Sequence, residues 1–298
     1  MAEPDLLGIM AERRRLVDAA LERWLPEQGP CPPKIHEAMR YSVFAGGKRL
    51  RPLLALLACE AVGGRPEDAL PAAAALEMIH TYSLIHDDLP AMDDDDYRRG
   101  RLTCHKVYGE AIAILAGDAL LTQAFQVLAD SSGAEIPASR RVHIVAEIAE
   151  AAGSLGMVGG QAMDILAEGQ QIDRATLLYL HTHKTGCLIR SSIRSGAIAG
   201  GAAGAKLDAL TRYGERLGLA FQIVDDILDI EGSTEEMGKT AGSDLRKGKA
   251  TYPGVVGMEV SRREAAGLLQ EAKEALRPLG EGGAVLVALA DFVGRRRH

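Results

Sequence analysis

Apolar residues recur every three or four positions along most of the chain, which is the spacing of helices with one buried face. Proline and glycine clusters separate the stretches. No segment shows a strong strand alternation, and no linker is long or polar enough to divide the chain. The pattern therefore predicts an all-α protein, with residues 1–298 as one domain. Helices are expected over residues 6–24, 34–44, 53–61, 66–89, 103–108, 109–129, 140–155, 174–186 and 210–229, and from residue 254 to the end.

Composition supports packed helices, because Ala and Leu dominate the 47% of hydrophobic residues and only 4% of residues are aromatic. The net charge of −7 argues weakly against nucleic acid or an anionic membrane as the main partner. Cys31, Cys59, Cys104 and Cys187 are widely separated and form no metal or redox motif, so we interpret them as reduced thiols. No signal-peptide core and no apolar run of membrane-spanning length is evident, and we expect a cytoplasmic protein without stable membrane association.

Six aspartates crowd residues 87–96. Pro90 disfavours helical geometry at Leu89, so the preceding helix should end there and leave the aspartates at its C-terminal end. The backbone dipole is already negative at that end, which makes the placement unfavourable unless cations bind. Oxygen ligands of this kind suit Mg²⁺, and Arg98 and Arg99 directly after them suit phosphate oxygens.

A second acidic group lies at Asp225, Asp226 and Asp229, on a stretch with helical spacing. Asp225 and Asp229 are four residues apart and share one helix face. A solvated acidic surface is the ordinary interpretation of such a pair. It is weaker here because no lysines follow at four-residue spacing. Two acidic groups that face each other could hold several Mg²⁺ ions against a diphosphate.

Basic residues gather at three places. Residues 46–52 combine two glycines with Lys48, Arg49 and Arg51 before a helix N-terminus, which is a ready anion site or else a basic surface turn. The polar loop Gly232–Gly248 with Lys239, and Lys249 just beyond, could close over a metal–diphosphate site or could be a solvated connector. The Arg-rich tail at 295–298 could likewise cover the site.

These motifs, in order, closely resemble those of the short-chain trans-isoprenyl diphosphate synthases, and are nearest to bacterial farnesyl diphosphate synthases. The matching segments are GGKRLRP, HDDLPAMDDDDYRRG, HKTG, FQIVDDILD and KGKATYP, within roughly residues 38–253. The resemblance implies a helical bundle around a deep central cavity, usually a homodimer. It also implies condensation of isopentenyl diphosphate with dimethylallyl or geranyl diphosphate. Three Mg²⁺ ions, or Mn²⁺ in their place, would be held between the two aspartate motifs.

The same resemblance assigns roles to individual residues. The metal ligands would be Asp87, Asp93 and Asp225, with Asp226 and Asp229 in support through water. The allylic diphosphate would be held by Arg98, Lys184 and Lys239, with Lys249 nearby. The isopentenyl diphosphate would be held by Lys48, Arg51, His80 and Arg99. Thr185 and Gln222 would place oxygens beside the developing allylic cation.

Product length is expected to depend on Tyr82 and Ser83, which lie roughly 6–8 Å below the metal site at helical rise. In the resembling family, bulky residues here form the cavity floor, and an aromatic residue at position 82 resembles farnesyl-producing enzymes. Ser83 is small, so the floor would be only half blocked. A geranyl or geranylgeranyl diphosphate synthase, a terpene cyclase, and a non-catalytic regulatory homologue are the alternatives. The basic 46–52 segment argues against a cyclase, and the presence of both aspartate motifs argues against a non-catalytic homologue.

Overall fold

The computed structural model describes residues 4–27, 32–130, 136–231 and 249–296. The N-terminal half contains α1 (Leu6–Trp24), α2 (Pro33–Val43), α3 (Leu50–Ala61), α4 (Pro66–Asp87), β1 (Tyr97–Arg98), β2 (Arg101–Leu102), α5 (Cys104–Tyr108), α6 (Glu110–Ala129) and α7 (Ala138–Ala152). The C-terminal half contains α8 (Met157–Ala167), α9 (Arg174–Leu180), the π-helix η1 (His181–Gly186), α10 (Cys187–Ala199), α11 (Gly204–Glu231), α14 (Tyr252–Val256), α15 (Met258–Ala275), the 3₁₀ segment η2 (Arg277–Gly283) and α16 (Ala284–Gly294). The predicted all-α class is confirmed.

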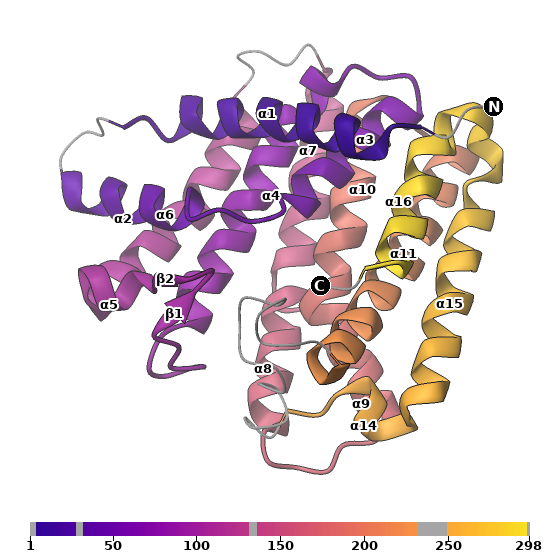
Figure 1. Cartoon of the computed structure of the whole chain (residues 1–298). Helices are drawn as coiled ribbons and strands as arrows, with labels where there is room; N and C mark the ends of the chain where they lie inside the picture. The colour runs from indigo at the N-terminus through magenta and orange to yellow at the C-terminus, as the bar shows by residue number, and fades with distance from the viewer. Residues whose placement is uncertain (1–3, 28–31, 131–135, 232–248, 297–298) are drawn as a thin grey trace.

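Helix α4 lies in the middle of the bundle, packed against α3, α6 and α10 (Figure 1). Its residues 72–76 are four alanines and a leucine, all buried, and small side chains let neighbouring helices approach closely. The contact of α3 with α10 is closer still, because a Cβ on Gly196 would clash with the backbone carbonyl of Ala55. Close packing of this kind fixes the position of the last turn of α4, where the first acidic motif begins.

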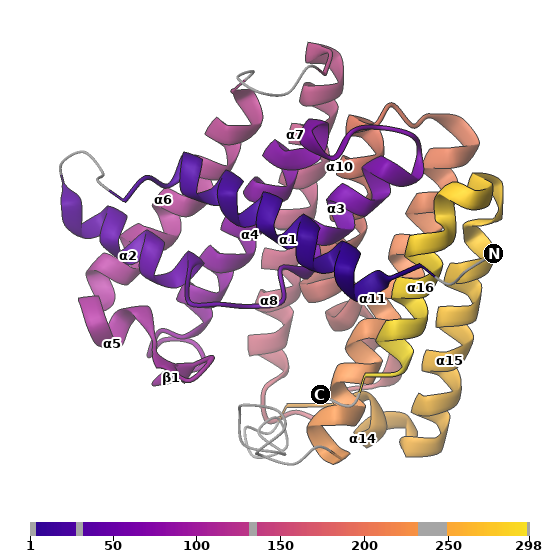
Figure 2. The same cartoon turned by 45° about the horizontal axis from the view of Figure 1, so that its top comes forward.

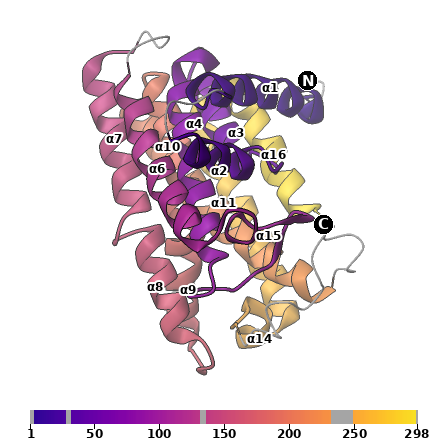
Figure 3. The same cartoon turned by 90° about the vertical axis from the view of Figure 1, so that its left-hand side faces the viewer.

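Other helices cover this centre. Helices α1 and α2 lie across the bundle (Figure 2), and α6 and α7 lie on the side away from α15 and α16 (Figure 3). A buried ion pair ties the segment before α3 to α4, since Arg49 Nη1 lies 2.8 Å from Glu77 Oε1. The hydroxyl of Tyr213 donates to the carbonyl of Leu286 at 2.8 Å and joins α11 to α16.

One short pair of strands accompanies the helices. β1 and β2 form a short antiparallel hairpin in which Tyr97 pairs with Leu102. Its turn residues, Arg99 and Gly100, have φ of 53° and 75°, the positive values that two-residue hairpin turns require. Strands of two residues are too short to show an alternating pattern, which is why the sequence did not reveal them.

The expectation about membrane-length apolar runs also needs correction. Two stretches, Glu110–Ala129 and Ala138–Ala167, are long and apolar enough to cross a membrane by length and composition. In their most apolar windows 39% and 33% of residues are buried inside the protein. Core helices of soluble proteins satisfy the same criterion.

The described cysteines agree with the expectation of reduced thiols. Cys59, Cys104 and Cys187 are free, and burial raises the pKa of the Cys59 thiol to about 12. Cys31 lies outside the described residues.

Candidate active site

A cavity of about 400 Å³ opens between α4, α8 and η1. Predicted site residues line it, namely Arg51, His80, Asp87, Lys184 and Thr185. The predicted floor residues Tyr82 and Ser83 also line it, and Tyr82 is only 6% exposed. Apolar residues of α8 complete the wall, among them Met157, Val158 and Ile165, which the sequence did not single out. The cavity lining therefore combines ionisable side chains with apolar ones.

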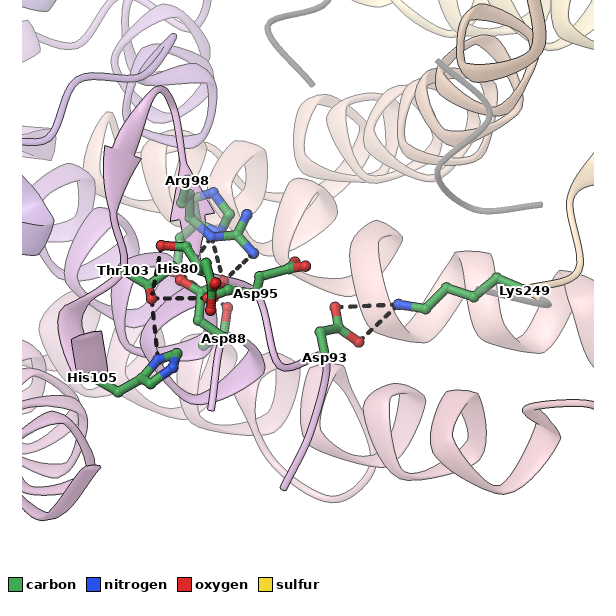
Figure 4. A network of polar contacts seen from close by, with 10 residues as sticks. His80, Asp88, Asp93, Asp95, Arg98, Thr103, His105 and Lys249 are labelled. Carbon is green, nitrogen blue, oxygen red and sulfur yellow. Dashed lines mark hydrogen bonds and ion pairs between the residues drawn. The ribbon is translucent and has the colours of Figure 1, made fainter. Parts of the chain in front are cut away.

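The first acidic motif brings Asp87 and Asp93 together. The chain turns back after α4, and the Asp93 N–H donates to the Asp87 carbonyl at 2.8 Å. The pKa of the Asp87 carboxyl is raised to about 6, chiefly by burial; Lys184 opposes the rise and the charge of Asp93 adds to it. Lys249 Nζ lies 3.0 and 3.2 Å from the two oxygens of Asp93 (Figure 4). A carboxyl with a raised pKa beside a second carboxylate is a place where a bound cation would be stabilising.

Asp88 has a different role from Asp87. It is 3% exposed and accepts from Arg98 Nε at 2.8 and 3.0 Å and from Arg98 Nη2 at 2.6 Å (Figure 4). The hairpin that carries Arg98 is held by Thr103, whose hydroxyl donates to the Asp95 carbonyl at 2.8 Å. Asp88 thus fixes the position of a predicted diphosphate-binding cation, a function the sequence did not assign to it.

Three of the four predicted isopentenyl-site residues, Arg51, His80 and Arg99, lie near one another. The pKa of Arg51 is lowered to about 10, chiefly by burial; Glu77 opposes this shift and the charge of Arg99 adds to it. Arg51 Nε is buried and has no hydrogen-bond partner among the described residues. Burial, and then the charges of Arg51 and Arg99, hold the pKa of His80 well below its usual value. A buried cationic group with an unpaired donor suits an anionic ligand.

Glycine backbone makes this convergence possible. Gly47 has φ of 123°, and a Cβ there would clash with the guanidinium of Arg99, which donates to the Gly46 carbonyl. Arg49, counted above among the cations of this segment, is instead buried between Asp18 at 3.0 Å and Glu77 at 2.8 Å. Its charge therefore stabilises the fold.

The second acidic motif lies on α11. Asp225 has a side chain 42% exposed, and Arg296 Nη2 lies 3.4 Å from its Oδ1. The Arg296 guanidinium also stacks over Phe221 at 4.7 Å from the ring centre. Burial lowers the pKa of Lys48, followed by the charge of Arg296, while Asp225 opposes them. The chain end that was expected to cover the site thus reaches it as far as Arg296; residues 297–298 lie outside the described part.

Asp226 and Asp229 are 4% and 3% exposed. The Asp226 carboxylate accepts from the Tyr252 N–H at 2.7 Å and from Gln222 Nε2 at 2.9 Å. His181 Nε2 lies 3.3 Å from the same carboxylate. The supporting metal role of these two aspartates stays a prediction.

The π-helix η1 presents Lys184 and Thr185. Lys184 Nζ lies 2.6 Å from Asp164 Oδ2, and the Thr185 hydroxyl donates to Gln222 Oε1 at 2.9 Å. Gly160 of α8 permits the approach, because a Cβ there would clash with the Lys184 backbone. Asp164 was missed in the sequence; its one signal was its position on a helix face one turn after that glycine.

The donor chemistry of the site fits divalent cations. In the part of the chain that the structure describes, no three His, Cys, Asp or Glu side chains converge closely enough to enclose an ion alone. Hard ions such as Mg²⁺ commonly take one or two carboxylates and complete their coordination with water and substrate phosphates. Asp87, Asp93 and Asp225 therefore remain the predicted ligands. Lys239 and the predicted lid over residues 232–248 lie outside the described residues.

Known proteins are similar to this chain over nearly its whole length. The chain is 50% identical over 296 residues to a dimethylallyltranstransferase of Fischerella ambigua (strain UTEX 1903), covering 99% of this chain and 84% of that one. It is 46% identical to a geranylgeranyl diphosphate synthase of Cyanophora paradoxa, covering 99% and 97% of the two chains. It is equally 46% identical to a farnesyl diphosphate synthase of Geobacillus stearothermophilus, over the whole of both chains.

Solved structures share the fold. Geranylgeranyl pyrophosphate synthetase from Pyrococcus horikoshii superimposes with a TM-score of 0.89 at 33% identity and covers 98% of each chain. The family model described as polyprenyl synthetase matches residues 32–278 of this sequence. The chain belongs to the polyprenyl synthetase family.

Proposed function

We propose that the protein condenses isopentenyl diphosphate with dimethylallyl and then geranyl diphosphate to give farnesyl diphosphate. Membership of the family makes the chain a prenyltransferase that acts on isoprenoid diphosphates. The observation that carries the proposal is the cavity, which is lined both by Arg51, His80 and Lys184 and by apolar residues of α8. An anionic head and a hydrocarbon tail would be accommodated together only in such a cavity.

The residues of the chain would act in a defined order. Arg98 and Lys184 would hold the allylic diphosphate, and Arg51 and Arg99 the isopentenyl diphosphate. The allylic C–O bond would then break, with its electron pair leaving on the diphosphate oxygen. The double bond of the second substrate would attack the allylic cation, and the released diphosphate would take the final proton. The dry apolar wall would keep water from the cation.

Mg²⁺ ions held by Asp87, Asp93 and Asp225 would neutralise the leaving diphosphate and lower the barrier to ionisation. We further propose that the protein is a homodimer, as the resemblance in sequence implies, and that it is cytoplasmic. The length of the product is the finer part of the proposal, because similarly close relatives are named for different products.

The test is a product assay. Purified protein receives both five-carbon diphosphates with Mg²⁺, and in parallel with a chelator, and the dephosphorylated alcohols are separated by length. A C15 product that requires Mg²⁺ is expected. A C10 or C20 product would retain the reaction and overturn the farnesyl assignment. Absence of condensation in the presence of bound Mg²⁺ would favour a non-catalytic regulatory protein.

Tyr82→Ala tests the floor of the cavity. Tyr82 is buried, and its ring packs edge-on against His86 at 5.7 Å between ring centres. Removing the ring should extend the cavity and shift the main product from C15 to C20 or longer. Tyr82→Phe is the matched control and should keep the C15 product. An unchanged product distribution in Tyr82→Ala would exclude Tyr82 from this role.

A further inference from the structure

Asp226 is bound entirely by groups of this chain in the contacts that the structure gives it. The Tyr252 N–H and His181 Nε2 lie at 2.7 and 3.3 Å from its Oδ2. Gln222 Nε2 lies 2.9 Å from its Oδ1. Asp225, its neighbour in sequence, has a side chain 42% exposed and faces Arg296 instead. The buried position of Asp226 indicates a function carried out through its neighbours.

The carboxylate determines how the Gln222 amide is oriented. A carboxylate only accepts hydrogen bonds, so the amide must turn its NH₂ group toward Asp226. The amide oxygen then faces Thr185, at 2.9 Å from its hydroxyl. An amide oxygen also only accepts hydrogen bonds, so the Thr185 hydroxyl must donate its single hydrogen to the Gln222 oxygen. The two bonds therefore fix the direction of the Thr185 hydroxyl.

Thr185 lies at the boundary of two spaces. It lines the cavity of about 400 Å³ that would hold the hydrocarbon chain. It also lines a polar pocket of about 120 Å³ shared with Gln222 and Asp226. Because its proton points to Gln222, the hydroxyl has only lone pairs left to present to the cavity. Lone pairs stabilise a positive charge, whereas a hydroxyl hydrogen in the same place would repel it.

We propose that Asp226 is a positioning residue that sets the hydrogen-bond direction of Gln222 and Thr185, so that the Thr185 oxygen faces the developing allylic cation. The inference rests on the proposed function and adds to it a residue that acts without touching substrate. It also separates the two adjacent aspartates of the second motif: Asp225 stays a predicted metal ligand, and Asp226 acts through its hydrogen bonds to the protein.

Asp226→Asn reverses this direction. The introduced amide would keep its oxygen toward the Tyr252 N–H and turn its NH₂ group toward Gln222. The Gln222 amide would then flip, and Thr185 would accept from it and turn its own hydrogen toward the cavity. We expect kcat to fall about tenfold to a hundredfold, with KM for both diphosphates within about threefold of the wild type. An Asp226→Asn variant with wild-type kcat would overturn the proposal.

The swapped variant Asp226→Asn/Gln222→Glu provides the decisive control. Its amide at position 226 can donate to the new carboxylate at position 222, and that carboxylate can accept from Thr185. The swap thereby restores the direction of the Thr185 hydrogen bond and the net charge, while the bond between positions 222 and 226 runs in the opposite direction. We expect this variant to recover kcat to within about threefold of the wild type. A swapped variant that stays as inactive as Asp226→Asn, or that does not fold, would contradict the proposal. A direct metal role for Asp226 predicts no recovery and a higher Mg²⁺ requirement.

Two further measurements isolate Thr185. In a Thr185→Val background, Asp226→Asn should cause little additional loss of kcat, because both changes act on one hydroxyl. An allylic diphosphate analogue with a protonated amine at the cationic carbon should bind about tenfold more weakly to Asp226→Asn, and an uncharged thio analogue equally well. Additive losses, or equal weakening of both analogues, would overturn the proposal. A wild-type protein that condenses nothing would count against the proposed function itself, whereas the analogue-binding comparison would still decide the orientation of Thr185.

Discussion

The two acidic motifs use the same pair of neighbouring aspartates in different ways. In each pair the first member, Asp87 or Asp225, is a predicted metal ligand, and the second, Asp88 or Asp226, is buried and hydrogen-bonded to groups of the protein. The partner of Asp88 is a cation, Arg98, on a hairpin. Two of the partners of Asp226 are a neutral amide and a backbone N–H. The first motif thus positions a charge and the second orients dipoles.

The motifs also differ in electrostatic cost. Burial raises the pKa of Asp87 to about 6, so its ionised form is disfavoured in the fold. Asp225 is partly exposed and has Arg296 beside it. The first motif therefore holds a charge that is stabilised only when cations bind, which is a common cost of active sites. Comparison of the two teaches that repeated acidic motifs need not be equivalent halves of one site.

The largest expected effect comes from Asp87→Asn. Condensation should fall about a thousandfold, because a ligand and a charge at the leaving group are lost. The metal-free variant should nevertheless be more stable than the wild type at pH 7.5, by about 1–2 kcal/mol in the free energy of unfolding. Steady-state assays and denaturant titration with a chelator would measure both.

The sign of that stability change follows from the raised pKa. An acid whose pKa is higher in the fold than in the unfolded chain destabilises the fold once it is ionised. The gain from Asp87→Asn should be complete above about pH 6 and vanish below about pH 4. Asp225→Asn is the matched control and should show no such gain. Equal gains in both variants would remove the proposed difference between the motifs.

Asp88→Asn should have the next largest effect. It weakens the charged hydrogen bonds to Arg98, and we expect a loss of about 2–3 kcal/mol in the free energy of unfolding. The KM for the allylic diphosphate should rise at least about tenfold, since Arg98 is no longer held. Asp226→Asn, by comparison, should change kcat. If both variants moved the same kinetic parameter, the distinction between positioning a charge and orienting dipoles would fail.

The smallest effect concerns Mg²⁺ binding by the substrate-free protein. Binding requires Asp87 to be ionised, so affinity should fall as the pH drops through about 6. Between pH 7 and pH 5 we expect about a tenfold decrease, measured by calorimetry. Asp87→Asn should bind more weakly at every pH and lose most of this dependence. If the Mg²⁺ affinity of the wild type did not change over this pH range, the role of Asp87 in Mg²⁺ binding would be refuted.

The helices were largely predictable because one periodic signal determines them. The helix over residues 6–24 was predicted with both ends as observed. The helix predicted to end at Leu89, before Pro90, ends two residues earlier, at Asp87. Helix α3 begins at Leu50 rather than at the predicted residue 53. Its N-cap residue is Arg49, whose backbone is left-handed with φ of 51°. No periodicity announces such a backbone conformation.

Parts of the site were harder to predict from the sequence because they depend on contacts between distant segments. Arg49 was grouped with Lys48 and Arg51 by sequence, but Glu77 on another helix neutralises it. Asp164 pairs with Lys184 across a helix contact that only a glycine allows. The two-residue strands and the π-turn are too short for a pattern. Residue types predicted the chemistry of the site, and three-dimensional neighbours decided which members are structural.

The π-helix η1 has a consequence for sequence alignment and for design. It lies between α9, which buries Leu177 and Leu180, and α10, which buries Leu188 and Ile189. Each residue advances an α-helix by about 100°, so the widened turn sets the angular phase between the two buried stripes. Deleting one residue there would restore a regular helix and rotate one stripe out of the core. The length of this segment is therefore as constrained as its side chains, and insertions or deletions should be tolerated elsewhere first.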